Sequence, residues 1–74
     1  MTGTARRDTQ AGTVVAFDAD VGLGEIESEA GDRYRFHCVE IADGSRTIDV
    51  GASVDFAVVA KFGRYEAATI RRER

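Results

Sequence analysis

The segment GTVVAFDADVGLGEI, residues 12–26, carries the pattern that decides the fold. Its first part, TVVAF, is β-branched and aromatic, and it ends at the turn-rich residues DADVG. The second part, VGLGEI, alternates two glycines with side chains of different character. These patterns predict two short strands joined by a turn, with Gly22 and Gly24 serving the curvature of a sheet or a bulge. Leu23 and Glu25 then share one face, because alternate residues of a strand point the same way.

Short β-type runs continue along the chain and alternate with turn clusters. RYRFHC at residues 33–38 alternates apolar and polar side chains, which is typical of a strand with one wet side. SVDFAVVAKF at residues 53–62 alternates in the same way, and RYEAATIRR at residues 64–72 ends the series. The longest connection, residues 39–52, is expected to begin with one helical turn. Five short strands without a long amphipathic helix predict a small antiparallel barrel, since closure removes exposed strand edges.

Length and charge indicate one small domain with an acidic body. The 74 residues are expected to comprise a flexible tail at 1–11, a barrel at 12–71 and a short basic tail at 72–74. Residues 12–70 contain five cationic and eleven acidic side chains, and so carry a net charge of −6. An acidic body repels phosphate, which weighs against tight binding of nucleic acid.

Several classes of protein are disfavoured by what the sequence lacks. No apolar run approaches the ~20 residues of a membrane span, and no hydrophobic stretch follows Arg6 and Arg7 as in a signal peptide. Cys38 is the single cysteine, so no intrachain disulfide is expected. A small domain without disulfides is typical of a reducing compartment, so we expect a cytoplasmic location. One histidine and one cysteine do not make a metal site, and no cofactor is expected. His37 and Cys38 point to opposite faces of a strand, so the protein is not expected to be an enzyme.

Three motifs, GTVVAFDAD, VGLGEI and YRFHCVEI, follow one another at a characteristic spacing. They resemble the bacterial cold-shock domain, in which G-x-V-K-W-F-N is followed by K-G-F-G-F-I and V-F-V-H-F. DGSRTIDVGASVDFAVV is similar to that family's loop and fourth strand. The resemblance covers about residues 12–70 and implies an all-β, five-stranded antiparallel barrel of the OB type. It also implies binding of single-stranded RNA or DNA by exposed aromatic side chains on strands one to three.

The expected binding face departs from the family's pattern. Residues that are not aromatic stand at six of the positions that the family fills with aromatic rings: Ala16, Leu23, Glu25, Arg35, Cys38 and Ser45. Base stacking contributes about 1–3 kcal/mol per base, so these replacements predict weak or altered binding. Arg35 could compensate in part, because a guanidinium plane stacks on a base and also contacts phosphate.

Two hypotheses follow. In the first, the protein binds single-stranded RNA or DNA weakly through an interface formed by Phe17, Leu23, Glu25, Arg35, His37, Arg46, Phe62 and Arg64. In the second, it no longer binds nucleic acid and acts as an adaptor that docks a component of the transcription or translation machinery. A monomer is expected in both.

Glu25 and Arg35 are central to the second hypothesis. They are expected to be neighbours on adjacent strands and to form a cross-strand ion pair worth about 0.2–1 kcal/mol. That pair is either simply solvated or part of a charged docking patch.

Overall fold

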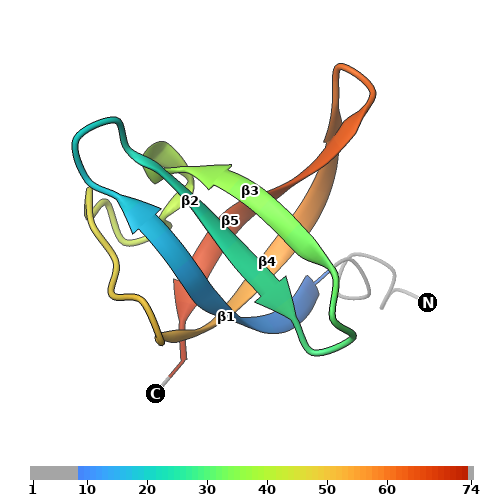
Figure 1. The fold of residues 1–74 in the computed structure, drawn as a ribbon, viewed down its shortest axis with the longest axis horizontal. Helices are drawn as coiled ribbons and strands as arrows, with labels where there is room; N and C mark the ends of the chain where they lie inside the picture. The colour runs from blue at the N-terminus through green and yellow to red at the C-terminus, as the bar shows by residue number, and fades with distance from the viewer. Residues whose placement is uncertain (1–8, 74) are drawn as a thin grey trace.

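The computed structural model describes residues 9–73, which form one closed barrel (Figure 1). The elements follow in the order β1 (Thr9–Asp18), β2 (Leu23–Ser28), β3 (Arg33–His37), the 3-10 helix η2 (Cys38–Glu40), β4 (Ser53–Lys61) and β5 (Arg64–Arg72). Around the barrel the strand order is β1-β2-β3-β5-β4. The predicted all-β, five-stranded fold and the predicted helical turn at the start of the long connection are confirmed. Within this described part, no helix is long and apolar enough to cross a membrane.

One strand pair differs from the predicted antiparallel arrangement. β1–β2, β1–β4, β2–β3 and β4–β5 are antiparallel, whereas β3 and β5 run parallel and pair at Arg35 and Glu66. From β3 the chain passes through η2, the long connection and β4, so β5 returns beside β3 in the same direction. A second parallel bridge, between Ile41 and Ile70, extends this seam.

The strands extend past the predicted bounds of the barrel, residues 12–71, at both ends. β1 begins at Thr9, which pairs with Ala57, so residues 9–11 belong to the barrel and not to a tail. Residues 1–8 and Arg74 lie outside the described part. β5 runs on to Arg72, whose guanidinium donates to the carboxylate of Asp43 and, at 2.8 Å, to the carbonyl oxygen of Thr47. Arg72 therefore holds the loop between η2 and β4 against the barrel.

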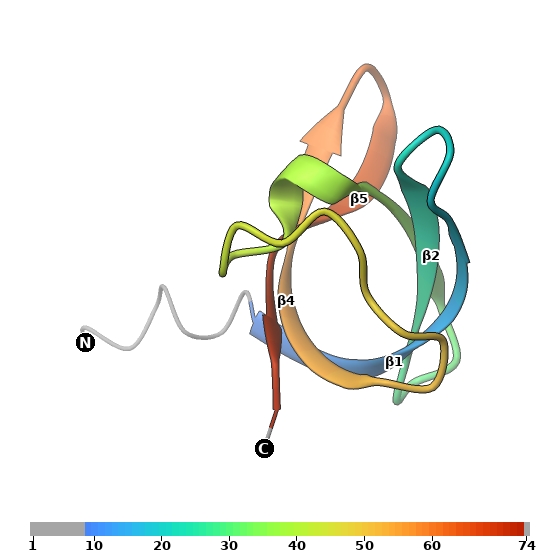
Figure 2. The ribbon, with the colours of Figure 1, turned by 90° about the vertical axis from the view of Figure 1, so that its left-hand side faces the viewer.

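The core is filled by the inward-facing residues of every strand. The largest fully buried side chains are Phe36, Phe56, Ile26, Ile70, Val14 and Val54. Ile41 and Ile48, from the connection between η2 and β4, join the same cluster. Figure 2 shows this connection crossing one end of the barrel, so its two isoleucines complete the core from that side.

Close packing requires both glycines of the VGLGEI motif, Gly22 and Gly24. A Cβ on Gly24 would lie 2.5 Å from Cζ of Phe36 and 2.8 Å from the carbonyl oxygen of Ala16. Gly22 has a φ of +73°, and a Cβ there would lie 2.8 Å from Sγ of Cys38. Cys38 packs against the core. The glycines thus serve the barrel, and Leu23 and Glu25, which alternate with them, face outward.

A bulge in β5 explains why two adjacent alanines of this strand, Ala67 and Ala68, are both buried. The β4–β5 register shifts between Asp55 and Ala57, and Thr69 adopts a left-handed φ of 50°. As a result Ala67 and Ala68 are both buried although they are adjacent. The backbone N–H of Thr69 donates to Oε1 of Glu40 at 3.2 Å, which ties the bulge to η2.

Candidate functional site

A groove of about 850 Å³ lies on the outer side of β2 and β3, between the end of β1 and the β4–β5 hairpin. It brings together six of the eight residues predicted for the interface: Phe17, Leu23, Glu25, Arg35, His37 and Phe62. Arg46 and Arg64 do not line it. Arg46 lies on the connection between η2 and β4 and Arg64 begins β5, and both are exposed.

Strand register arranges the groove residues in two rows across the sheet. The first row runs from β1 to β5 and consists of Ala16, Glu25, Arg35 and Glu66. The second row consists of Asp18, Leu23 and His37. The two rows therefore hold charged and aliphatic side chains and one imidazole where a base-stacking surface would need consecutive flat rings.

The aromatic residues of the groove are not equally available. Phe17 is half-buried, and its ring stacks on that of Phe36 with centroids 6.0 Å apart and planes at 11°. Its ring is therefore largely occupied by the core. His37 is exposed, and its Nδ1 accepts from the backbone N–H of Val39 at 3.3 Å. This contact orients the imidazole.

Phe62 is the most exposed aromatic residue, at the tip of the β4–β5 hairpin that projects from the barrel in Figure 1. Phe62 and Gly63 have φ values of 50° and 81°, as the two central residues of a type I′ turn require. Asparagine or glycine normally fills the first of these positions, because a left-handed conformation costs other residues about 1–2 kcal/mol. An aromatic ring is thus held in solvent at a cost in stability.

The charges lining the groove sum to −2, with histidine neutral. Four carboxylates belong to Asp18, Glu25, Glu40 and Glu66, against the two cations Arg35 and Lys61. Nζ of Lys61 lies 4.0 Å from Oε2 of Glu40 and 3.9 Å from Oε1 of Glu66, so one cation is already shared by two carboxylates. The sequence did not indicate Lys61, Glu40 or Glu66. Parallel pairing of β3 with β5 brings Glu66 to the groove, while Glu40 reaches it from η2 and Lys61 from the end of β4.

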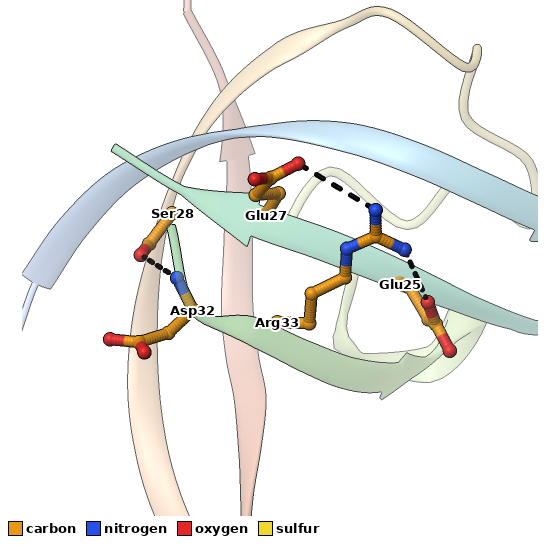
Figure 3. A network of polar contacts seen from close by, with 5 residues as sticks. All are labelled: Glu25, Glu27, Ser28, Asp32 and Arg33. Carbon is orange, nitrogen blue, oxygen red and sulfur yellow. Dashed lines mark hydrogen bonds and ion pairs between the residues drawn. The ribbon is translucent and has the colours of Figure 1, made fainter. Parts of the chain in front are cut away.

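The predicted ion pair between Glu25 and Arg35 is wrong in its cationic partner. The two residues are cross-strand neighbours, as expected. However, the cation that contacts Glu25 is Arg33, with Nη1 3.4 Å from Oε1 of Glu25 and Nη2 3.8 Å from Oε1 of Glu27 (Figure 3). Arg33 is a diagonal neighbour, within reach of a long side chain. Within residues 9–73, Arg35 has no ion pair of its own.

The groove shows no arrangement suited to holding a metal. In the part of the chain that the structure describes, no three histidine, cysteine or carboxylate side chains converge on one point. The imidazole of His37 and the thiol of Cys38 also do not meet, because Cys38 packs against the core. The chemistry available in the groove is therefore stacking, hydrogen bonding and charge contact.

Comparisons with known proteins agree on one family. The model of the "Cold-shock" DNA-binding domain matches residues 10–73. The cold shock-like protein CspLB of Listeria monocytogenes serovar 1/2a is 43% identical over 51 residues, which cover 68% of this chain and 77% of that protein. Among solved structures, drosophila Unr CSD456 matches with a TM-score of 0.77 at 27% identity. That match covers 100% of this chain and 32% of the Unr chain, so this chain spans about a third of that one's length.

Proposed function

Because this chain belongs to the cold-shock DNA-binding domain family, we propose that it binds single-stranded RNA or DNA weakly in the groove across β2 and β3. The groove itself is the observation that supports this, since six of the residues expected to contact nucleic acid line it. Arg35 is the cation best placed for the task, because it is exposed in the groove and has no carboxylate partner within residues 9–73. Its guanidinium offers a flat surface for a base and donors for a phosphate.

Binding is expected to be weak because few stacking surfaces are left. Ala16, Leu23 and Glu25 offer no ring, and Phe17 is engaged with the core. Arg35, His37 and Phe62 then share the contacts that would otherwise be worth about 1–3 kcal/mol for each stacked base.

The net negative lining predicts few phosphate contacts and hence a shallow dependence on salt. For single strands, log K falls with log salt by about 0.7 for each phosphate contacted. Two or three contacts, from Arg35 and Lys61 in the groove and from Arg64 at the start of β5 beside it, therefore predict a slope of about −1.4 to −2.1.

Fluorescence anisotropy with labelled hexathymidine and with a short single-stranded RNA tests this proposal. We expect saturable binding at low salt that Arg35→Ala weakens several-fold. Arg46→Ala is the matched control, because it removes the same charge from outside the groove. Absence of binding at tens of micromolar in low salt, the weak end for non-specific contacts, would contradict the proposal.

A second candidate function, docking of a protein, is favoured by the charge of the groove. A lining of −2 with exposed Leu23, Val39 and Phe62 suits a basic segment with apolar side chains better than it suits a phosphodiester. In this alternative the protein is an adaptor for the transcription or translation machinery. Affinity capture from a lysate, repeated with Glu25→Arg, tests it: an unchanged set of captured proteins would count against this surface.

In both proposals the protein binds without catalysis and acts as a monomer in the cytoplasm. Sedimentation of the purified chain at several concentrations would test the proposed monomeric state, and a mass that rises with concentration would contradict it.

A further inference from the structure

Glu25 places a carboxylate in the middle of the groove, where a stacking surface would have a ring. It stands in the first row between Ala16 on β1 and Arg35 on β3, and its side chain is 39% exposed. Within residues 9–73, Oε1 contacts Arg33 at 3.4 Å and Oε2 has no hydrogen-bond partner. A carboxylate has about four lone-pair sites, so most of its accepting capacity is open to a ligand.

Arg33 offsets the charge of this carboxylate from outside the groove. Its guanidinium lies between Glu25 and Glu27, as Figure 3 shows, and it does not line the groove. The turn before it is closed by Oγ of Ser28, which accepts from the backbone N–H of Asp32 at 3.2 Å. Because a cation faces Glu25 from the far side, a phosphate approaching the groove meets less repulsion than an isolated carboxylate would cause.

The neighbours of Glu25 leave room for a base beside it. Ala16 is directly opposite, at a cross-strand Cβ separation of about 4.5–5.5 Å, and it has the shortest side chain of the first row. Leu23 lies two residues away on the same face, about 7 Å along the strand, and offers an exposed apolar surface. A base that lies over Ala16 and Leu23 therefore presents one edge to the carboxylate.

A carboxylate accepts hydrogen bonds and donates none, so it selects among base edges. Guanine carries two adjacent donors, N1–H and the N2 amino group, which match the two oxygens of a carboxylate. Thymine and uracil carry a single N3–H between two carbonyl oxygens, which the carboxylate repels. We propose that Glu25 makes this groove prefer a guanine over a thymine or uracil in a single strand. This inference rests on the proposed function and names the base that the groove reads.

Two hexanucleotides distinguish this inference: hexathymidine and the same strand with one central thymine replaced by guanine. We expect the guanine strand to bind about fivefold more tightly, the low end of what a bidentate base contact provides. A third strand with inosine in place of guanine keeps N1–H and lacks the N2 amino group, and we expect it to lose most of that gain. Glu25→Gln should bind hexathymidine better than the natural chain does and distinguish the strands less than twofold.

Glu27→Gln is the matched control. It removes the same charge from the same face of β2 and also lies beside Arg33, but Glu27 does not line the groove. We expect it to keep the guanine preference in full. Binding of both strands by the natural chain with equal affinity would overturn the inference and leave the proposed function standing, as would a preference that survives Glu25→Gln.

A second measurement decides the case of very weak binding. Backbone amide shifts of Ala16, Leu23 and Glu25 are followed by NMR while guanosine or uridine monophosphate is added at millimolar concentration. We expect saturable shifts with the guanosine nucleotide and much smaller ones with the uridine nucleotide. No response to any strand or nucleotide would overturn both this inference and the proposed function.

Discussion

The two sides of β1, β2 and β3 differ sharply although they alternate residue by residue. On the inner side Val14, Ile26 and Phe36 are at most 1% exposed and form the core. On the outer side, Glu25 and Arg35 face the groove. The inner side must fill a fixed volume, whereas the outer side needs only to suit a ligand. A barrel can therefore keep its fold while its binding surface changes completely.

The largest expected effect separates the two sides by stability. Phe36→Ala removes a fully buried ring, and we expect the free energy of unfolding to fall by about 3–5 kcal/mol. That is comparable with the whole stability of a domain this small, so much of the protein should be unfolded. Leu23→Ala on the outer side should change stability by less than about 0.5 kcal/mol. Urea denaturation followed by circular dichroism measures both, and similar losses would refute the separation.

The next effect is on binding and concerns the outer side alone. Leu23→Phe combined with Glu25→Phe adds two stacking surfaces, each worth about 1–3 kcal/mol, so hexathymidine should bind at least tenfold more tightly. The free energy of unfolding should stay nearly constant because both positions face solvent. Val50→Phe is the control, since Val50 is exposed outside the groove. An equal gain in affinity from Val50→Phe would mean that an added aromatic side chain strengthens binding wherever it stands on the surface.

Phe62 faces solvent, and we expect its left-handed backbone conformation to lower the stability of the protein. It therefore differs from the other outer residues, which should affect stability little. Phe62→Asn puts the preferred residue into the left-handed position of the type I′ turn, and should raise the free energy of unfolding by about 1 kcal/mol. It should also weaken binding of single strands. Phe62→Ala removes the ring without relieving the backbone, so it should lose binding without gaining stability. If Phe62→Asn does not stabilise the protein, the ring makes contacts that offset its conformation.

The smallest effect is electrostatic and concerns two carboxylates, Asp55 and Glu73. The pKa of Glu73 is raised above its usual value, chiefly by a hydrogen bond with Asp55 and by the negative charge of that carboxylate. The folded state holds this proton more tightly than the unfolded chain does. The resulting stability is present below the usual pKa of 4.5 and is lost as the pH rises through the raised one.

Asp55→Asn removes this repulsion, so the protein should be slightly more stable at neutral pH and its stability should fall less between acid and neutral pH. Thermal melts across that range provide the measurement. Asp49→Asn, a change at an exposed residue of the long connection, serves as the control and should leave the pH profile unchanged.

Most of the fold could be predicted because local patterns and tertiary demands agree. The alternation around Phe36 and the glycine at position 24 have one cause: the ring of Phe36 packs against the backbone at Gly24. The start of β1 was placed three residues late, because the pairing of Thr9 with Ala57 is set by register across the barrel and leaves no alternation in TQA. The bulge at Thr69 was likewise missed, since it arises from the fit of β5 to β4.

The parts of the candidate site that depend on strand register could be predicted. The parts that depend on the length of a side chain, or on the parallel pairing of β3 with β5, could not. The neighbouring positions of Glu25 and Arg35 follow from alternation, but the choice of Arg33 as ionic partner depends on how far a long side chain extends. Glu66 reaches the groove only because β5 returns parallel to β3. Arg46 and Arg64 were expected near the ligand from their loop and rim positions, and the arrangement of those segments keeps them off the groove.

The parallel seam between β3 and β5 also bears on motion. Within residues 9–73 these strands pair at one position, Arg35 with Glu66, and both residues line the groove. A seam with so few backbone hydrogen bonds opens at lower free energy than the rest of the barrel, so amide hydrogens there should exchange with solvent deuterium early. The seam also joins residues distant in sequence, so it should close late in folding. The groove therefore lies across the strand pair that we expect to separate most easily, and its width should vary as β3 and β5 move apart and together.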